Sequence, residues 1–159
     1  MAQSLRKAAA EVASTALEAS VELQGYGGRF VFRIVTHNVE VTKELVGVAV
    51  VGTVFVGLGA LWAHSHLAKT IINATLNNVF GGENDDQNIE EPRIGSLLVP
   101  VRCFTDERFL EVLEEYESGE IKRRFEKEFE QVGLKVVGLT VEIENMDEVK
   151  KRSTAINVR

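Results

Sequence analysis

His64 and His66 are the residues whose type and spacing come closest to a metal site. Imidazole is a common zinc ligand, but a zinc site needs three or four ligands, and no third ligand stands at metal spacing from this pair. Two residues apart on a helix, the side chains would also not share a face. We therefore expect no metal, and we interpret the pair as a polar cap at the end of an apolar segment.

A glycine-rich run, Gly25-Tyr26-Gly27-Gly28, is the candidate for a phosphate loop. Phosphate loops follow a strand and end in Lys-Ser/Thr or open a helix, whereas this run precedes a possible strand, which is typical of a flexible turn. No nucleophile and base occur in a recognisable setting. The sequence thus predicts a protein that is not an enzyme and needs no cofactor.

Charge is distributed unevenly along the chain. Residues 1–44 carry five basic and five acidic side chains, residues 45–68 carry none, and residues 69–159 carry thirteen basic and nineteen acidic ones. The net charge of −6 argues against nucleic acid as a partner, because phosphate binding needs clustered Lys and Arg. A basic group at 122–127 could meet anionic lipid or an acidic partner, but it alternates with glutamates and is more simply a solvated helix face.

The uncharged run at residues 45–63 is long enough for a membrane span. At ~1.5 Å per residue a helix of this length measures roughly 28 Å, close to the hydrocarbon core of a bilayer. We predict a transmembrane helix within residues 45–68, with Ala49, Thr53 and Gly57 on one face that could drive helix association and a homo-oligomer. The alternative is two buried strands with glycines at their bends, although no polar turn separates them.

The predicted location is a membrane with the carboxyl-terminal domain in the cytosol. Cys103 is the only cysteine, so no intrachain disulfide can form and nothing indicates an oxidising compartment. The basic residues before the span, Arg29, Arg33 and Lys43, instead favour a cytosolic amino terminus. The orientation stays open at this point.

Four regions follow from these patterns: an amino-terminal helical or amphipathic region at 1–44, the span, an acidic linker at 81–93, and an α/β domain at 94–159. Alternation predicts strands at 97–103, an edge strand or bulge because of Pro100, and at 137–143. Between them, Thr105 starts a helix that Ser118-Gly119 ends, and a second helix covers 120–132. The fold class predicted is α/β, with a membrane-spanning helix followed by a small β-α-α-β sandwich. Two strands are marginal, so others must come from 29–41 or from a second chain.

Three segments of this domain resemble a known family: IGSLLVPVRC, LEEYESGEIKRRFEKEFE and LTVEIENMDEVKKR. They are similar to the later half of the amino-terminal domain of the death-receptor adaptor TRADD and its relatives in invertebrate immune proteins, over residues 94–152. The resemblance implies a non-enzymatic interaction module in cell-death or innate-immune signalling, with a partner surface near Ser96 and Leu98. This sequence differs from the family in two respects: it lacks a clear copy of the family's earlier strand and helices, and it lacks a death domain.

The functional expectation is a membrane-anchored, self-associating interaction module. Its expected partners are further copies of itself, the lipid bilayer and signalling proteins, and not nucleic acid. The alternative is an oligomeric pore-forming effector or channel in the membrane.

Overall fold

The computed structural model describes residues 26–45, 47–82, 86–90, 92 and 97–158. These residues form two antiparallel sheets and five helices, α2 to α6. The larger sheet has the strand order β4 (Gln87–Ile89), β5 (Leu97–Cys103), β1 (Gly28–Val35) and β7 (Thr140–Ile143). The smaller sheet has the order β3 (Val54–Phe55), β2 (Asn38–Val41) and β6 (Leu134–Val137).

The two sheets are joined by one long, bent ribbon. β1 and β2 follow each other in sequence and pair antiparallel with β7 and β6 respectively. The bend lies where Thr36 and His37 face Gly138 and Leu139. Gly138 has φ +70°, and a Cβ there would lie 2.6 Å from His37 Nδ1, so only glycine fits this corner.

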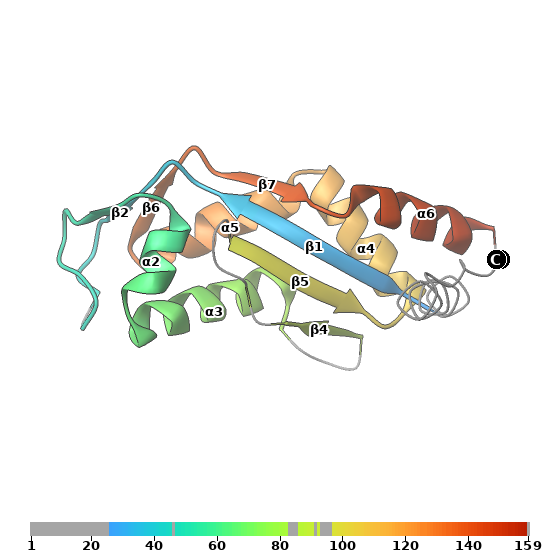
Figure 1. Cartoon of the computed structure of the whole chain (residues 1–159), viewed down its shortest axis with the longest axis horizontal. Coiled ribbons are helices and arrows are strands. Elements are labelled where there is room, and N and C mark those ends of the chain that lie inside the picture. Colours follow the sequence, from blue (N-terminus) through green and yellow to red (C-terminus); the bar gives the residue numbers. More distant parts are fainter. Residues whose placement is uncertain (1–25, 46, 83–85, 91, 93–96, 159) are drawn as a thin grey trace, which may run out of the picture.

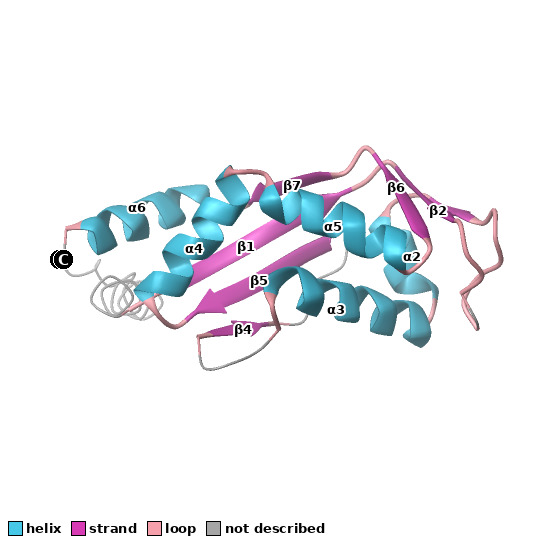
Figure 2. Cartoon of the chain, turned by 180° about the vertical axis from the view of Figure 1, so that it is seen from behind, coloured by secondary structure: helices cyan, strands magenta, loops and turns pink. Residues whose placement is uncertain are grey.

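Helices cover one face of the larger sheet, as Figure 2 shows for α3 (His66–Phe80), α4 (Asp106–Glu117) and α5 (Glu120–Gln131). The core beneath them is a chain of aromatic rings. Phe30 stacks on Phe32 and Phe109 with ring centroids 5.4 Å and 4.7 Å apart, and Phe32 meets Phe80 at 5.1 Å. Such pairs add roughly 0.5–1.5 kcal/mol each beyond the area that they bury. The alternating side chains Phe30, Phe32 and Ile34 point into this core. The strand predicted within residues 29–41 is therefore confirmed.

The helix signals of the carboxyl-terminal half are also confirmed. Thr105 Oγ1 accepts a hydrogen bond from Arg108 N at 3.1 Å and caps α4. Gly119, at φ +83°, takes the left-handed conformation between α4 and α5. A further helix, α6 (Met146–Asn157), follows β7 and was not predicted.

The predicted transmembrane helix is wrong. The described residues of this run, 45 and 47–63, instead include a bridge between Leu45 and Ala49, then β3, and then the start of the seven-residue helix α2 (Leu58–His64). No helix among the described residues is long and apolar enough to cross a membrane. The fold class is therefore α/β without the spanning segment.

Glycine conformation and tertiary packing explain this outcome. Gly47, Gly52 and Gly57 have φ of 79°, 94° and 87°, a region that a right-handed helix does not contain. The apolar run is then divided between core and surface: Leu58, Leu61 and Trp62, spaced along one face of α2, are buried. The alternative of two buried strands is equally wrong, because the valines between Val50 and Val56 are exposed.

The order strand, helix, helix, strand is present, but the last predicted strand, 137–143, is divided at Gly138 and Leu139 into β6 and β7, which belong to different sheets. Neither of them pairs with β5. β1 lies between β5 and β7, so the sheet depends on residues from both halves of the chain. β5 is an internal strand, not an edge, because β4 pairs with its other side. Pro100 is tolerated there because it lies where β4 ends. Its carbonyl accepts a hydrogen bond from Glu90 N at 2.9 Å on that side of β5, and its nitrogen, which has no hydrogen to donate, faces the same side.

Candidate interaction surface

The outer face of the larger sheet is not covered by any described helix. In Figure 1, β1 and β5 lie in front of α4 and α5, and α6 continues beside β1 where β7 ends. Asn145, the residue before α6, holds the start of that helix against β1. Its side chain accepts a hydrogen bond from Val31 N and donates one to the Arg29 carbonyl oxygen, both at 2.9 Å. We call this surface the open sheet face; its side chains are those that alternate with the core-facing ones, namely Arg29, Val31, Arg33, Val35, Asn88, Leu98, Pro100, Arg102, Thr140 and Glu142.

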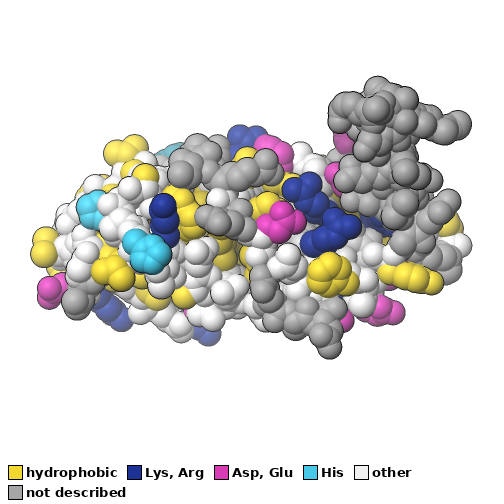
Figure 3. All heavy atoms as spheres, turned by 60° about the horizontal axis from the view of Figure 1, so that its bottom comes forward, with side chains coloured by type: hydrophobic (Ala, Val, Ile, Leu, Met, Phe, Trp, Pro, Cys, Tyr) yellow, Lys and Arg dark blue, Asp and Glu magenta, His cyan; other side chains and the backbone are white. Residues whose placement is uncertain are grey.

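Three arginines lie on the open sheet face although the chain is acidic as a whole. Arg29 and Arg102 are directly opposite each other on β1 and β5, and two like charges in this position destabilise a strand pair. Arg29 Nε is 4.0 Å from a Glu90 carboxylate oxygen, and Arg33 lies 3.8 Å from Glu142 and 3.7 Å from Glu144. These pairs are partly exposed, so each contributes at most about 1 kcal/mol. Figure 3 shows basic side chains beside acidic and apolar ones on this side of the molecule.

Of the two partner-binding residues predicted from the sequence, Leu98 lies on the open sheet face. It is half-buried and stands opposite Arg33. Ser96 lies outside the described residues. The arginines have no partner-binding role among the sequence predictions, because they come from two strands that are far apart in the chain.

The predicted oligomer face does not exist as a helical stripe. Ala49 belongs to the bridge with Leu45, Thr53 ends the following turn, and Gly57 is the residue before α2. The three residues therefore occupy different turns of the backbone instead of one side of a helix.

The contacts of His64 indicate a structural role. His64 ends α2 and His66 begins α3, and His64 Nε2 lies 2.9 Å from the Val48 carbonyl oxygen while its ring meets the edge of Phe55. Among the described residues, no three His, Cys, Asp or Glu side chains converge as metal ligands do.

The glycine-rich run leads into β1 as a close crossing over the end of β5. A Cβ on Gly27 would lie 2.0 Å from the Cys103 carbonyl oxygen, and Gly27 N donates to Asp106 Oδ1 at 2.8 Å. The glycine is thus required by packing within the domain.

A polar cluster that the sequence did not reveal joins α3, β4 and α4. Arg108 donates to Gln87 Oε1 at 2.7 Å and to the Phe80 carbonyl at 2.8 Å, and Gln87 Nε2 also donates to the Phe80 and Gly82 carbonyls. Gln87 is 1% exposed. This arrangement satisfies the carbonyls at the end of α3, so we interpret it as structural.

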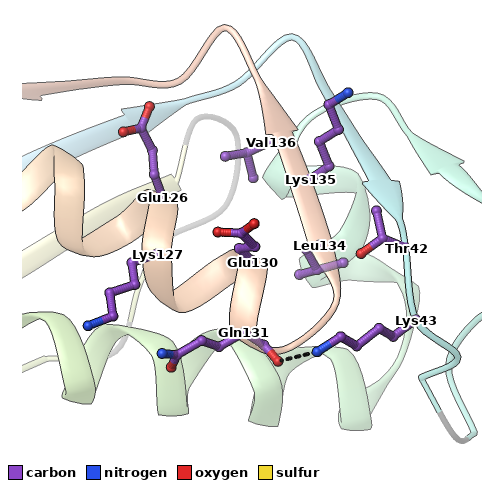
Figure 4. Close-up of a pocket in the computed structure, with 9 residues that line it drawn as sticks. All are labelled: Thr42, Lys43, Glu126, Lys127, Glu130, Gln131, Leu134, Lys135 and Val136. Carbon is purple, nitrogen blue, oxygen red and sulfur yellow. Dashed lines mark hydrogen bonds between the residues drawn. The ribbon is translucent and has the colours of Figure 1, made fainter.

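An open groove of about 850 Å³ runs between α5 and β6. Figure 4 shows Glu126, Lys127 and Glu130 of α5 on one side and Lys135 on the other, with Lys43 Nζ 3.5 Å from the Gln131 carbonyl. Its lining contains no Cys, His or Ser and carries mainly Lys and Glu side chains, so it offers ion-pairing groups.

Cys103, on the core side of β5, is buried. Its burial raises the pKa of the thiol to about 12, an effect that Arg108 opposes and nearby carboxylates reinforce. The thiol is therefore neutral and unreactive near neutral pH.

Comparison with known protein families, characterised proteins and solved structures found no match to this chain.

Proposed function

We propose that the chain is a non-enzymatic protein-interaction module that binds an acidic partner through the open sheet face. The observation that carries this proposal is the concentration of Arg29, Arg33 and Arg102 on a sheet face that no described helix covers. A cell-death or innate-immune signalling role is supported by the resemblance of residues 94–152 to the TRADD amino-terminal-domain family.

The composition of this face matches that of a binding surface. Val35 and Leu98, both half-buried, lie among the arginines, and interfaces combine an apolar centre with arginine, which is also frequent among the residues that dominate binding energy. An arginine can pair with a partner carboxylate through two parallel hydrogen bonds.

The proposed location is the cytosol, supported by the single, buried and unpaired Cys103. The pore alternative depended on membrane-crossing helices. Since no described helix is long and apolar enough, no observation favours that alternative.

The test is a comparison of captured partners between two charge-reversed variants. Tagged wild-type chain, the face variant Arg33→Glu/Arg102→Glu and the control variant Lys122→Glu/Lys127→Glu would be cross-linked to their neighbours in cells, and the captured proteins would be quantified. The control makes the same change of charge on the exposed side of α5. We expect the face variant to lose the specific partners by about tenfold or more, with the control unaffected.

Both variants should unfold near the wild-type temperature, because Arg102, Lys122 and Lys127 are exposed and the ion pairs of Arg33 are partly exposed. An unchanged set of partners in the face variant, with the fold intact, would refute the proposal.

A further inference from the structure

The connection between β2 and α2 presents an unusual amount of exposed apolar side chain. Val50, Val51, Val54 and Val56 are 65%, 61%, 55% and 81% exposed. We call these four residues the valine edge. In Figure 3, apolar side chains stand out at the end of the molecule that carries the histidines. By typical side-chain areas the valine edge exposes roughly 400 Å² of apolar surface, as much as the largest patch on most monomers.

The backbone at the valine edge is open as well. Val41 N donates to the Thr53 carbonyl at 2.8 Å, and the register pairs Glu40 with Val54 and Val39 with Phe55. In an antiparallel pair, alternate residues direct their N–H and C=O toward the partner strand. Thr53 and Phe55 face β2, so the N–H and C=O of Val54 face the outer side of β3.

The other sheet edges carry charges that discourage pairing with a second chain. β6 has Lys135 beside the charged groove against α5, β7 has Glu142, and β4 is flanked by Asp86 and Glu90. Charged side chains of this kind are the usual protection of an edge strand. β3 has none, because no Asp, Glu, Lys or Arg occurs between Glu44 and Lys69.

A second copy of this chain is the partner that fits this edge. Two β3 strands related by a two-fold axis would pair with Val54 opposite Val54, so that apolar side chains meet and no charge is buried. The nearest like charges, Glu40 on each β2, would be separated by three strand spacings, roughly 14 Å, where salt screens them.

Lipid is a poorer match for this edge. Surface-binding segments combine their apolar residues with a basic face or with Trp at the headgroup level. The valine edge has neither, and Lys43 at its base is followed by Glu44.

We propose that the chain forms a two-fold dimer by pairing of its β3 edges through the valine edge. This surface is separate from the open sheet face, so the inference goes beyond the proposed function and does not depend on it. Two patches of roughly 400 Å² give an interface at the small, transient end of the range, so we expect a reversible dimer that dissociates on dilution.

Sedimentation velocity over a wide concentration series tests the dimer directly. The full chain should shift from monomer to dimer, and Val54→Lys should hold it as a monomer. The matched control is Val137→Lys, the same substitution at an exposed valine on the β6 edge; it should dimerise like the wild type. A wild-type chain that stays monomeric throughout, open-ended aggregation, or equal behaviour of the two variants would each overturn the proposal.

A cysteine variant tests the register without relying on a charged substitution. Opposed residues in a hydrogen-bonded antiparallel pair have Cα atoms about 5.5 Å apart, within the range that a disulfide spans. Under mild oxidation, in which two thiolates lose two electrons to the oxidant and form one S–S bond, Val54→Cys should give a covalent dimer at least about tenfold faster than Val137→Cys. Equal rates would refute the pairing, as would binding of the monomer to neutral lipid vesicles that is lost in Val54→Lys.

Discussion

The phenylalanines of β1 and the valines of the β2–β3 connection are similarly apolar, yet the molecule treats them in opposite ways. Phe30 and Phe32 are completely buried under α4 and α3, whereas Val51 and Val56 are mostly exposed. The difference comes from what packs against each segment, since three helices cover β1 but β3 lies at an edge. Apolar content alone therefore does not determine where a segment lies; its backbone conformation and its neighbours do.

The largest expected effect is in the aromatic core. Phe32→Ala should lower the free energy of unfolding by about 3–5 kcal/mol, because it removes a fully buried ring that contacts Phe30, Phe80 and Tyr116. Val51→Ala, at the exposed end of the comparison, should change it by less than about 0.5 kcal/mol. Denaturant unfolding measures both, and comparable losses would show that the two regions are not different in packing.

Arg108 and Arg33 sharpen the contrast for charged residues. Arg108→Ala should cost about 2 kcal/mol, since it removes the hydrogen bond to the buried Gln87 Oε1 and one donor from the Phe80 carbonyl, to which Gln87 Nε2 still donates. Arg33→Ala should cost less than about 1 kcal/mol because its ion pairs are exposed. Equal losses in urea unfolding would indicate that the open sheet face is part of the stability core.

The raised pKa of Cys103 predicts that the free energy of unfolding falls at alkaline pH. Its pKa in the folded chain is about 12, above the ordinary value of 9.0, so its contribution is complete below pH 9 and is lost as the pH rises toward 12. At about pH 10, one unit above the ordinary pKa, the loss would be roughly 1.4 kcal/mol. The alkaline decline in unfolding free energy should be shallower in Cys103→Ala; identical slopes would contradict the assignment.

Substitution of Gly52 should change the stability by a smaller amount, and the sign of that change distinguishes the observed turn from a continuous helix. A Cβ at Gly52 would meet nothing within 4 Å, so Gly52→Ala isolates the cost of φ +94° for a residue with a side chain, about 1 kcal/mol of destabilisation. In a continuous helix the same substitution would stabilise by about 1 kcal/mol. The sign of the change in thermal unfolding temperature separates the hairpin from the helix.

The parts of the fold that the sequence predicted are those with local signals. Thr105 and Gly119 mark the ends of α4 through contacts within a few residues, and Phe30 and Phe32 show the alternation of a half-buried strand. The position of β1 between β5 and β7 could not be read in this way, because those pairings join residues more than sixty positions apart.

The apolar run was misread for a related reason. Hydropathy records that residues 45–63 avoid charge, but it carries no information on the sign of φ at Gly47, Gly52 and Gly57 or on the bond from Val41 N to Thr53. The candidate surface was predicted only at Leu98. Arg29 and Arg102 become neighbours through strand pairing and therefore had no common signal in the sequence.

The most direct test is amide hydrogen exchange of residues 41–63, measured by NMR in buffer without detergent. The structure predicts a patterned result: Val41 and Gly52, whose N–H groups bond to the Thr53 and Val41 carbonyls, should be protected, whereas Val51 at the tip should exchange fast. Continuous protection from Val48 to Trp62, obtained only in detergent micelles, would contradict the hairpin and restore a single long helix.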